Sequence, residues 1–262
     1  MRLPIRARRA LSRPLDSIPV RVRAGPNKGC RWSLPVSGRG FASGRFELAK
    51  FEALAAIVSL GDVVWDVGAH YGYATLLTAR LAGPEGSVWS FEPSRLNRSY
   101  LTRHVAWNCS GRANVLPYAL AERDGKEAFG GSGSSMALGL GRGDEEVEVR
   151  SISGMLDAGV PPPTVMKVDA EGSESRIVES LVRTQVRPVV MCAIHDEKQL
   201  ELCMEALHQA DYEVLPSGPI RKFLNDDSVW GGDPDIVALP QNDPRLRDLL
   251  SRTDLFRDVS AF

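Results

Sequence analysis

The chain has 262 residues, of which 43% are hydrophobic and 25% charged, so it can hold one substantial α/β domain or two small ones. Its formal net charge of −1 predicts no global attraction to nucleic acid or to an anionic membrane, and no apolar run approaches the roughly 20 residues that a bilayer span requires. Four scattered cysteines without a CxxC pair argue against a zinc ribbon or a disulfide framework, and they suit a reducing, cytoplasmic location.

Residues 1–44 are expected to form a basic N-terminal extension that includes a first strand. The segment 1–25 is rich in arginine, and Asp16 is its only acid. This bias is typical of a transit peptide or a polyanion-binding arm, but also of a plain solvated extension. Prolines at positions 4, 14 and 19 interrupt any long amphipathic helix, which favours the solvated extension leading into a strand near PVRVRAG.

Residues 45–240 alternate between helical segments and short apolar strands, which predicts one α/β domain. Helices are expected at about 46–60, 73–83, 94–108, 174–185 and 197–210, and strands at 63–67, 87–92, 114–120, 164–170, 188–195, 212–215 and 235–240. This order favours a parallel sheet with helices on both faces. The last two strands have no clear helix between them and suggest an antiparallel hairpin at the sheet edge.

Two further segments stand apart from this rhythm. Residues 129–153 are Gly/Ser-rich at first and then alternate like an edge strand, which indicates either a surface loop or a mobile flap over the strand ends. Residues 241–262 predict a short amphipathic C-terminal helix, with Asp243 as its cap and Pro244 in its first turn. That helix could dock on its own domain or contribute to a homodimer.

The stretch VVWDVGAHYGYATLLTAR, residues 63–80, places a glycine-spaced turn between the first strand of this domain and its helix. The turn lacks the lysine of GxxxxGK[ST] and the spacing of GxGxxG, and the carboxylate of Asp66 would repel a pyrophosphate. S-adenosylmethionine carries no phosphate but has a positive ammonium and a positive sulfonium. We therefore expect Asp66 to pair with the ammonium, directly or through water, while Gly68 and Gly72 allow a close approach of the backbone.

A second acid supports this cofactor. Glu92 ends the next strand in VWSFEPS and should lie beside the end of the first strand. One carboxylate can accept two hydrogen bonds from a ribose diol, as acids at this position do in nucleoside-binding sheets. Because NAD uses the same contact, Glu92 alone does not choose the cofactor. Asp66, the two glycines and Glu92 together favour S-adenosylmethionine.

These motifs, with ALAERDG and VMKVDAEGSE further on, resemble in content and order the FkbM-type S-adenosylmethionine-dependent methyltransferases. The resemblance runs from about Gly25 to Pro240. It implies the class I methyltransferase fold, a Rossmann-like sheet of seven strands with the last one antiparallel, and O-methylation of sugars, polyketides and related metabolites. The candidate cofactor-binding residues are Glu47, Asp66, Gly68, Ala69, His70, Tyr71, Gly72, Glu92, Pro93, Asn97 and Ala119. His70 replaces the common Asn of the family, and Ala193 replaces a frequent Glu.

The motif KVDAEGSE is the second group of residues that could take part in the chemistry. Asp169 closes a strand, Glu171 follows in a turn, and Ser173 is expected to cap the next helix. These acids could simply satisfy helix amides. An alcohol is a poor nucleophile while neutral, so methyl transfer to it needs a base or a metal. His195, at the end of the fifth strand, is the best base candidate, with Asp169 or Glu171 orienting it or binding acceptor hydroxyls.

Several alternatives stay open at this point. Asp169, Glu171 and His195 could hold Mg²⁺ or another divalent metal, although we favour a site without metal. The function best supported is an O-methyltransferase acting on a hydroxyl of a sugar, glycan or secondary metabolite. The rivals are a non-catalytic nucleoside-binding partner subunit and a methyltransferase that acts on nitrogen or on nucleic acid. Neutral net charge and the lack of a base-stacking aromatic motif argue against nucleic acid.

Overall fold

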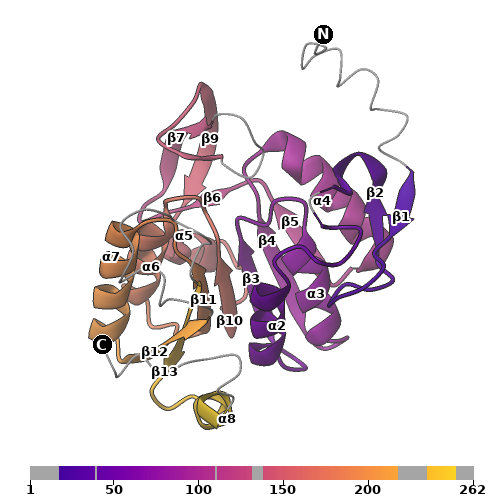
Figure 1. Cartoon of the computed structure of the whole chain (residues 1–262). Helices are drawn as coiled ribbons and strands as arrows, with labels where there is room; N and C mark the ends of the chain where they lie inside the picture. Colours follow the sequence, from indigo (N-terminus) through magenta and orange to yellow (C-terminus); the bar gives the residue numbers. More distant parts are fainter. Residues whose placement is uncertain (1–17, 39, 110, 132–137, 218–234, 252–262) are drawn as a thin grey trace.

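The apolar runs of the sequence form a seven-stranded sheet in the computed structural model, which describes residues 18–38, 40–109, 111–131, 138–217 and 235–251 (Figure 1). Its strands lie in the order β12-β13-β11-β10-β3-β4-β5. Their bounds are β3 Val63–Val67, β4 Ser87–Phe91, β5 Ala113–Leu116, β10 Val165–Val168, β11 Val189–Ala193, β12 Tyr212–Ser217 and β13 Asp235–Pro240.

Strand direction follows the expectation from the sequence. The strands β3, β4, β5, β10 and β11 are mutually parallel, and β13 runs antiparallel to both β11 and β12. The late hairpin is therefore confirmed, with β13 inserted next to β11 and β12 left at the edge. Because β13 runs in reverse, its first residue Asp235 pairs with Ala193 at the carboxyl ends of the parallel strands.

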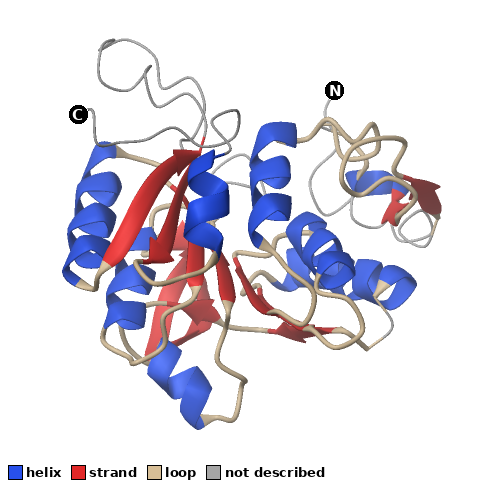
Figure 2. Cartoon of the chain, turned by 90° about the horizontal axis from the view of Figure 1, so that it is seen from below, coloured by secondary structure: helices blue, strands red, loops and turns tan. Residues whose placement is uncertain are grey.

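Helices cover both faces of the sheet (Figure 2). On one face α2 (Leu48–Ile57), α3 (Tyr73–Leu81) and α4 (Arg95–Asn108) pack around Val64, Val88 and Val165. On the other, α5 (Ile152–Asp157), α6 (Glu174–Val182) and α7 (Glu197–Gln209) pack around Trp65, Met166 and Val190. Alternate residues of each strand thus fill two separate cores, as expected for strands buried on both sides.

A small second sheet projects from the first, with the order β6-β9-β7-β8 (Figure 1). Its strands are β6 (Ala119–Leu120), β7 (Gly125–Gly130), β8 (Gly139–Leu140) and β9 (Glu145–Arg150). The strand expected at 114–120 is therefore wrong in part: β5 ends at Leu116 and β6 belongs to the second sheet, since Pro117 cannot donate to a ladder. Residues 129–153, for which the sequence predicts a surface loop or a mobile flap, contribute β8, β9 and the end of β7 to this sheet, and residues 132–137 lie outside the described part.

The flanking segments pack against the domain. The strands β1 (Pro19–Arg21) and β2 (Arg31–Ser33) form an antiparallel pair, followed by the 3-10 turn η1 (Leu34–Val36). Helix α8 (Arg245–Ser251) starts where Asp243 accepts a hydrogen bond from the Arg245 amide at 2.8 Å, and Arg245 donates to the Ile57 carbonyl of α2 at 3.1 Å. Helix α8 thus packs against its own domain. Residues 1–17 and 252–262 lie outside the described ranges.

Among the helices of the described residues, none combines the length and the apolar character that are needed to cross a bilayer.

Candidate functional site

A cavity opens at the carboxyl ends of β3, β4 and β10, where parallel α/β sheets bind ligands. We call one part the β4 end, lined by Glu92, Pro93, Asn97, Tyr118, Ala119 and Leu120, and the other the β10 end, lined by Glu47, Lys50, Lys167, Asp169, Ala170, Glu171 and Ser173. Of the residues proposed from sequence, Gly68, Ala69 and His70 also line the cavity, whereas Asp66, Tyr71, Gly72 and His195 are not among its lining residues.

The turn after β3 requires its glycines for steric reasons. Gly68 has φ 72°, and a Cβ there would lie 1.8 Å from the Asp169 carbonyl oxygen, so only glycine lets β3 and β10 end so close together. His70 also has a left-handed backbone, with φ 50°. Asn and His both adopt this conformation more readily than most residues, which explains how His70 replaces the Asn common in the family.

Glu92 anchors the β4 end of the cavity. Its Oε2 accepts a hydrogen bond from the His70 amide at 2.7 Å, and its Oε1 accepts from the Ser94 amide at 2.8 Å and from Asn97 Nδ2 at 3.5 Å. Burial raises the pKa of Glu92 to about 7, against the opposing effect of these donors. Carboxylate oxygens offer about four acceptor positions, so Glu92 retains capacity for a ligand hydroxyl.

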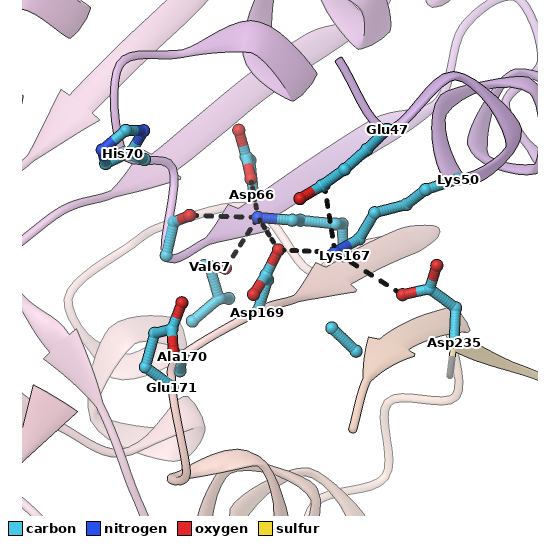
Figure 3. Close-up of polar contacts among 12 residues, drawn as sticks. Glu47, Lys50, Asp66, Val67, His70, Lys167, Asp169, Ala170, Glu171 and Asp235 are labelled. Atoms are coloured by element: carbon cyan, nitrogen blue, oxygen red, sulfur yellow. Dashed lines mark hydrogen bonds and ion pairs between the residues drawn. The ribbon is translucent and has the colours of Figure 1, made fainter. Parts of the chain in front are cut away.

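Asp66 lies behind the cavity wall. It is fully buried, its Oδ2 accepts from Thr75 Oγ1 at 2.6 Å, and its Oδ1 lies 3.3 Å from Lys167 Nζ. Asp66 Oδ1 contacts Lys167 as an ion pair and Asp66 does not line the cavity, so a pairing of this carboxylate with a cofactor ammonium, directly or through water, stays a prediction. Lys167 in turn donates to the carbonyl of Gly68 at 3.0 Å, so Asp66 acts on the glycine turn through this lysine (Figure 3).

The β10 end is a network of alternating charges centred on Asp169 (Figure 3). Lys50 Nζ lies 2.9 Å from Asp169 Oδ2, 3.4 Å from Glu47 Oε2 and 3.6 Å from Asp235 Oδ1. Lys167 Nζ is 3.6 Å from the same Asp169 oxygen. Burial alone would raise the pKa of Asp169, but Lys50, Lys167 and His195 hold it well below its usual value.

Asp235 has the opposite character. Burial raises its pKa to about 7, Lys50 opposes that rise, and the nearby charges of Asp169 and Glu47 add to it. Burial would lower the pKa of Lys50, but Asp169, Asp235 and Glu47 raise it well above the usual lysine value. Lys50 is therefore a permanent ammonium among three carboxyl groups.

His195 lies beside the two acids of the KVDAEGSE motif. Its Nε2 is 3.6 Å from Asp169 Oδ1 and 3.6 Å from Glu171 Oε2, and its Nδ1 is 3.0 Å from the buried Glu174 Oε1. Burial would lower the pKa of His195, but Glu174, Asp169 and Glu171 raise it to about 9. The imidazole is consequently protonated at neutral pH and must lose that proton before it can act as a base.

The helix after this motif begins differently from the expectation. Ser173 occupies the cap position of α6 but its side chain makes no capping hydrogen bond. Glu174 replaces it, since its carboxylate accepts from the amides of Ala170 at 2.9 Å and Gly172 at 3.0 Å. Glu171 adopts a left-handed φ of 51°, a conformation that is uncommon outside glycine. Glu171 and Glu174 thus shape this turn and also lie next to His195.

Sequence reasoning missed Lys50, Asp235 and an aromatic wall of Phe41, Phe46 and Phe51. In the segment 46–60 the sequence singles out the apolar face and Glu47 but not Lys50, although Glu47 and Lys50 are spaced i, i+3 and can form an ion pair. That spacing was the available signal for Lys50. No signal in the sequence indicates Asp235, because only the reversed direction of β13 brings this residue to the site.

A divalent cation could be held geometrically by Asp169, Glu171 and His195, whose ligand atoms all lie within 4.8 Å of one another. The same atoms form a self-consistent cluster without metal, because protonated His195 and the two lysines compensate the acids. Geometry therefore allows both arrangements, and our expectation of a site without metal stays a prediction.

Helices cover both faces of this sheet, and β13, the strand next to its edge, runs antiparallel to its neighbours. This arrangement is the Rossmann-like fold of class I methyltransferases, as expected from the sequence. The cavity lies at the strand ends where that class binds its cofactor. The chain also matches the family model described as "Methyltransferase FkbM domain" over residues 66–226. It belongs to the FkbM methyltransferase family.

The proteins similar to this chain share modest sequence identity with it. The hexuronic acid methyltransferase AglP of Haloferax volcanii is 30% identical over 125 residues, which are 46% of this chain and 50% of AglP, so the chain spans about half the length of this curated relative. Among solved structures, the O-methyltransferase TomG of Streptomyces achromogenes, involved in tomaymycin synthesis, aligns with a TM-score of 0.47 at 15% identity over 74% of this chain and 80% of TomG. A precorrin-6y C5,15-methyltransferase of Geobacter metallireducens aligns with a TM-score of 0.46 at 14% identity over 74% and 87%. Neither structure informs on the acceptor at this level of similarity.

Proposed function

We propose that this protein is an O-methyltransferase that transfers the methyl group of S-adenosylmethionine to a hydroxyl of a sugar, glycan or related metabolite. The observation that carries the proposal is one cavity that joins Glu92, suited to a ribose diol, to an acidic β10 end suited to a hydroxyl acceptor. The family supports methyl transfer, and the name of the relative AglP supports a carbohydrate acceptor.

The charge of the site fits this cofactor. The carboxyl groups of Glu47, Asp169, Glu171 and Glu92 line the cavity, against the ammonium groups of Lys50 and Lys167. S-adenosylmethionine supplies an electrophilic methyl group on a positive sulfonium, which an acidic cavity attracts and a pyrophosphate cofactor would not match. Glu92 would bind the ribose hydroxyls, and the turn at Gly68 and Ala69 would let the backbone approach the rest of the cofactor.

The β10 end would position the acceptor. Asp169 and Glu171 can accept hydrogen bonds from sugar hydroxyls, which directs an oxygen lone pair toward the methyl group. His195, once deprotonated, would take the hydroxyl proton through Nε2, the nitrogen that faces both acids. Glu174 would fix the ring by its contact with Nδ1.

Calorimetry with S-adenosylmethionine and with S-adenosylhomocysteine tests the cofactor directly. We expect both to bind, and binding of neither would overturn the proposal. Incubation with radiolabelled S-adenosylmethionine and a panel of hexose and hexuronic acid glycosides then tests transfer. Binding without transfer to the panel, in a protein that also fails to label whole-cell metabolite extracts, would favour the rival function of a non-catalytic nucleoside-binding subunit.

A further inference from the structure

Lys50 reaches the site from outside the region that matches the family. It lies on α2, ahead of residues 66–226, and its partner Asp235 begins β13 after that region. Its ammonium nevertheless contacts Asp169 of the KVDAEGSE motif at 2.9 Å. Three segments far apart in the sequence thus converge at the β10 end (Figure 3).

The contacts divide the Asp169 carboxylate into two sides. Oδ2 faces Lys50 at 2.9 Å and Lys167 at 3.6 Å, while Oδ1 faces His195 Nε2 at 3.6 Å. Lys50 has a side chain only 11% exposed, so water competes little for its ammonium. A buried lysine that bridges three carboxyl groups is costly to desolvate, which makes a purely stabilising role a weak explanation.

We propose that Lys50 is a positioning residue for methyl transfer: it holds Asp169 by Oδ2, so that Oδ1 faces His195 and is presented to the acceptor hydroxyl. Glu47, at the N-cap position of α2, and Asp235, at the start of β13, hold the lysine in turn. The domain matched by the family is therefore completed by residues on either side of it. This inference rests on the proposed function for its consequence in catalysis, but the coupling of Lys50 to Asp169 is a property of the protein alone.

The coupling can be measured without an acceptor. In full-length protein labelled with ¹³Cγ-aspartate, the Asp169 resonance is assigned by its loss in Asp169→Asn and followed as pH is lowered. In the wild type we expect it to stay at the ionised position throughout the folded range. In Lys50→Met we expect a titration step of Asp169 to appear within the folded range, because loss of the nearest ammonium raises the pKa of this carboxyl. An unmoved Asp169 resonance in folded Lys50→Met overturns the proposal.

Matched variants separate this effect from loss of folding. Lys50→Arg keeps the charge and should keep the wild-type titration. The double variant Lys50→Met/Asp235→Asn removes one cation and one acid together, so it should fold where the single variant does not and still show the titration step of Asp169. Lys28→Met removes an exposed lysine of the 25–30 loop and should change nothing.

Transfer kinetics test the catalytic consequence once an acceptor is found. We expect Lys50→Met to lower kcat by about 100-fold or more, and to change the Kd of S-adenosylmethionine by less than about threefold. The pH at which turnover rises should move upward, because loss of the lysine charge leaves His195 facing more negative surroundings. Equal losses in kcat and cofactor affinity, with no shift of the pH profile, would overturn the proposal. If no methyl transfer is found at all, the proposed function fails while the resonance of Asp169 still decides the role of Lys50.

Discussion

Asp66 Oδ1 lies 3.3 Å from Lys167 Nζ, and both side chains are buried beneath the turn that follows β3. Burial would lower the pKa of Lys167, but Asp66 and Asp169 raise it, so the lysine stays charged. The same ammonium donates to the Gly68 carbonyl at 3.0 Å. This buried pair therefore ties the sheet interior to the floor of the cavity.

Replacing Asp66 by Asn should destabilise the protein strongly, because it leaves Lys167 buried with one of its two carboxylate partners. Breaking such a pair typically costs about 3–5 kcal/mol in free energy of unfolding, which urea titration measures. Glu146→Gln is the matched control: it breaks the exposed pair with Lys126 at 3.0 Å and should cost at most about 1 kcal/mol. Equal losses for the two variants would show that Asp66 has no special structural role.

Glu92→Gln should weaken binding of S-adenosylmethionine by about 10- to 150-fold, since hydrogen bonds to a charged group contribute roughly 1.5–3 kcal/mol. Glutamine is the informative choice because its side chain has a similar shape and can still accept from the His70 amide. Isothermal calorimetry at pH 8 measures the change. Affinity retained within about twofold would remove Glu92 from the cofactor site.

The raised pKa of Glu92, about 7, also predicts a pH dependence of binding. A protonated carboxyl has fewer acceptor positions and carries a donor of its own, so a ribose diol binds best to the ionised form. Binding should therefore release a proton below about pH 7, and affinity should fall by up to tenfold for each unit by which the pH is lowered. Calorimetry in buffers of different ionisation enthalpy counts that proton. Glu92→Gln should release none, and proton release of the same size in the variant would contradict this origin.

Much of the site was predictable because its residues follow strand ends, and parallel strands end at one edge. Glu92, Gly68, Asp169 and Glu171 were found in this way, and all four line the cavity. The seven-stranded fold followed from the same alternation of apolar runs and helices.

The orientation of individual side chains was not predictable from such patterns. Asp66 is the last strand residue but one, and period-two alternation allowed either a cavity-facing or a buried carboxylate. Which occurs depends on Thr75 and Lys167, two partners 9 and 101 positions away. Asp235 likewise reaches the site only through pairing of β13 with β11, a contact that local sequence does not encode.

Arg176 links the second sheet to α6 by ion pairs, and replacing it should increase local opening of that sheet. Its guanidinium donates to Glu127 Oε2 at 3.0 Å and to Glu122 Oε1 at 3.2 Å, which joins α6 to β7 and to the segment after β6. In Arg176→Ala, hydrogen exchange of the strands β7 and β9 should accelerate by about tenfold, while the core strand β10 should be unaffected. Arg183→Ala, which removes the exposed pair with Glu179 on the same helix, is the control and should leave exchange unchanged.

Turnover should rise with pH toward about 9 if His195 is the proton acceptor. Its raised pKa means that each pH unit below 9 lowers the neutral fraction by about tenfold. His195→Gln should flatten this rise and lower turnover by about 100-fold at high pH, with cofactor affinity nearly intact. The sign for stability is opposite: protonated His195 stabilises the fold fully below about pH 6.5, and this contribution is lost as pH rises through 9. A turnover plateau from neutral pH upward would exclude His195 as the base.

Chelation of divalent metal by EDTA should leave turnover unchanged. The ligand atoms of Asp169, Glu171 and His195 lie close enough for a cation, but Asp169 Oδ2 already contacts two ammonium groups and His195 carries a proton at neutral pH. A metal would have to displace that proton and withstand the repulsion of Lys50 and Lys167, which weakens any binding. Activity assayed after dialysis against EDTA, with and without added Mg²⁺ or Mn²⁺, measures this. Loss of activity on dialysis and its recovery on adding either metal would contradict the prediction and assign these three residues as ligands instead.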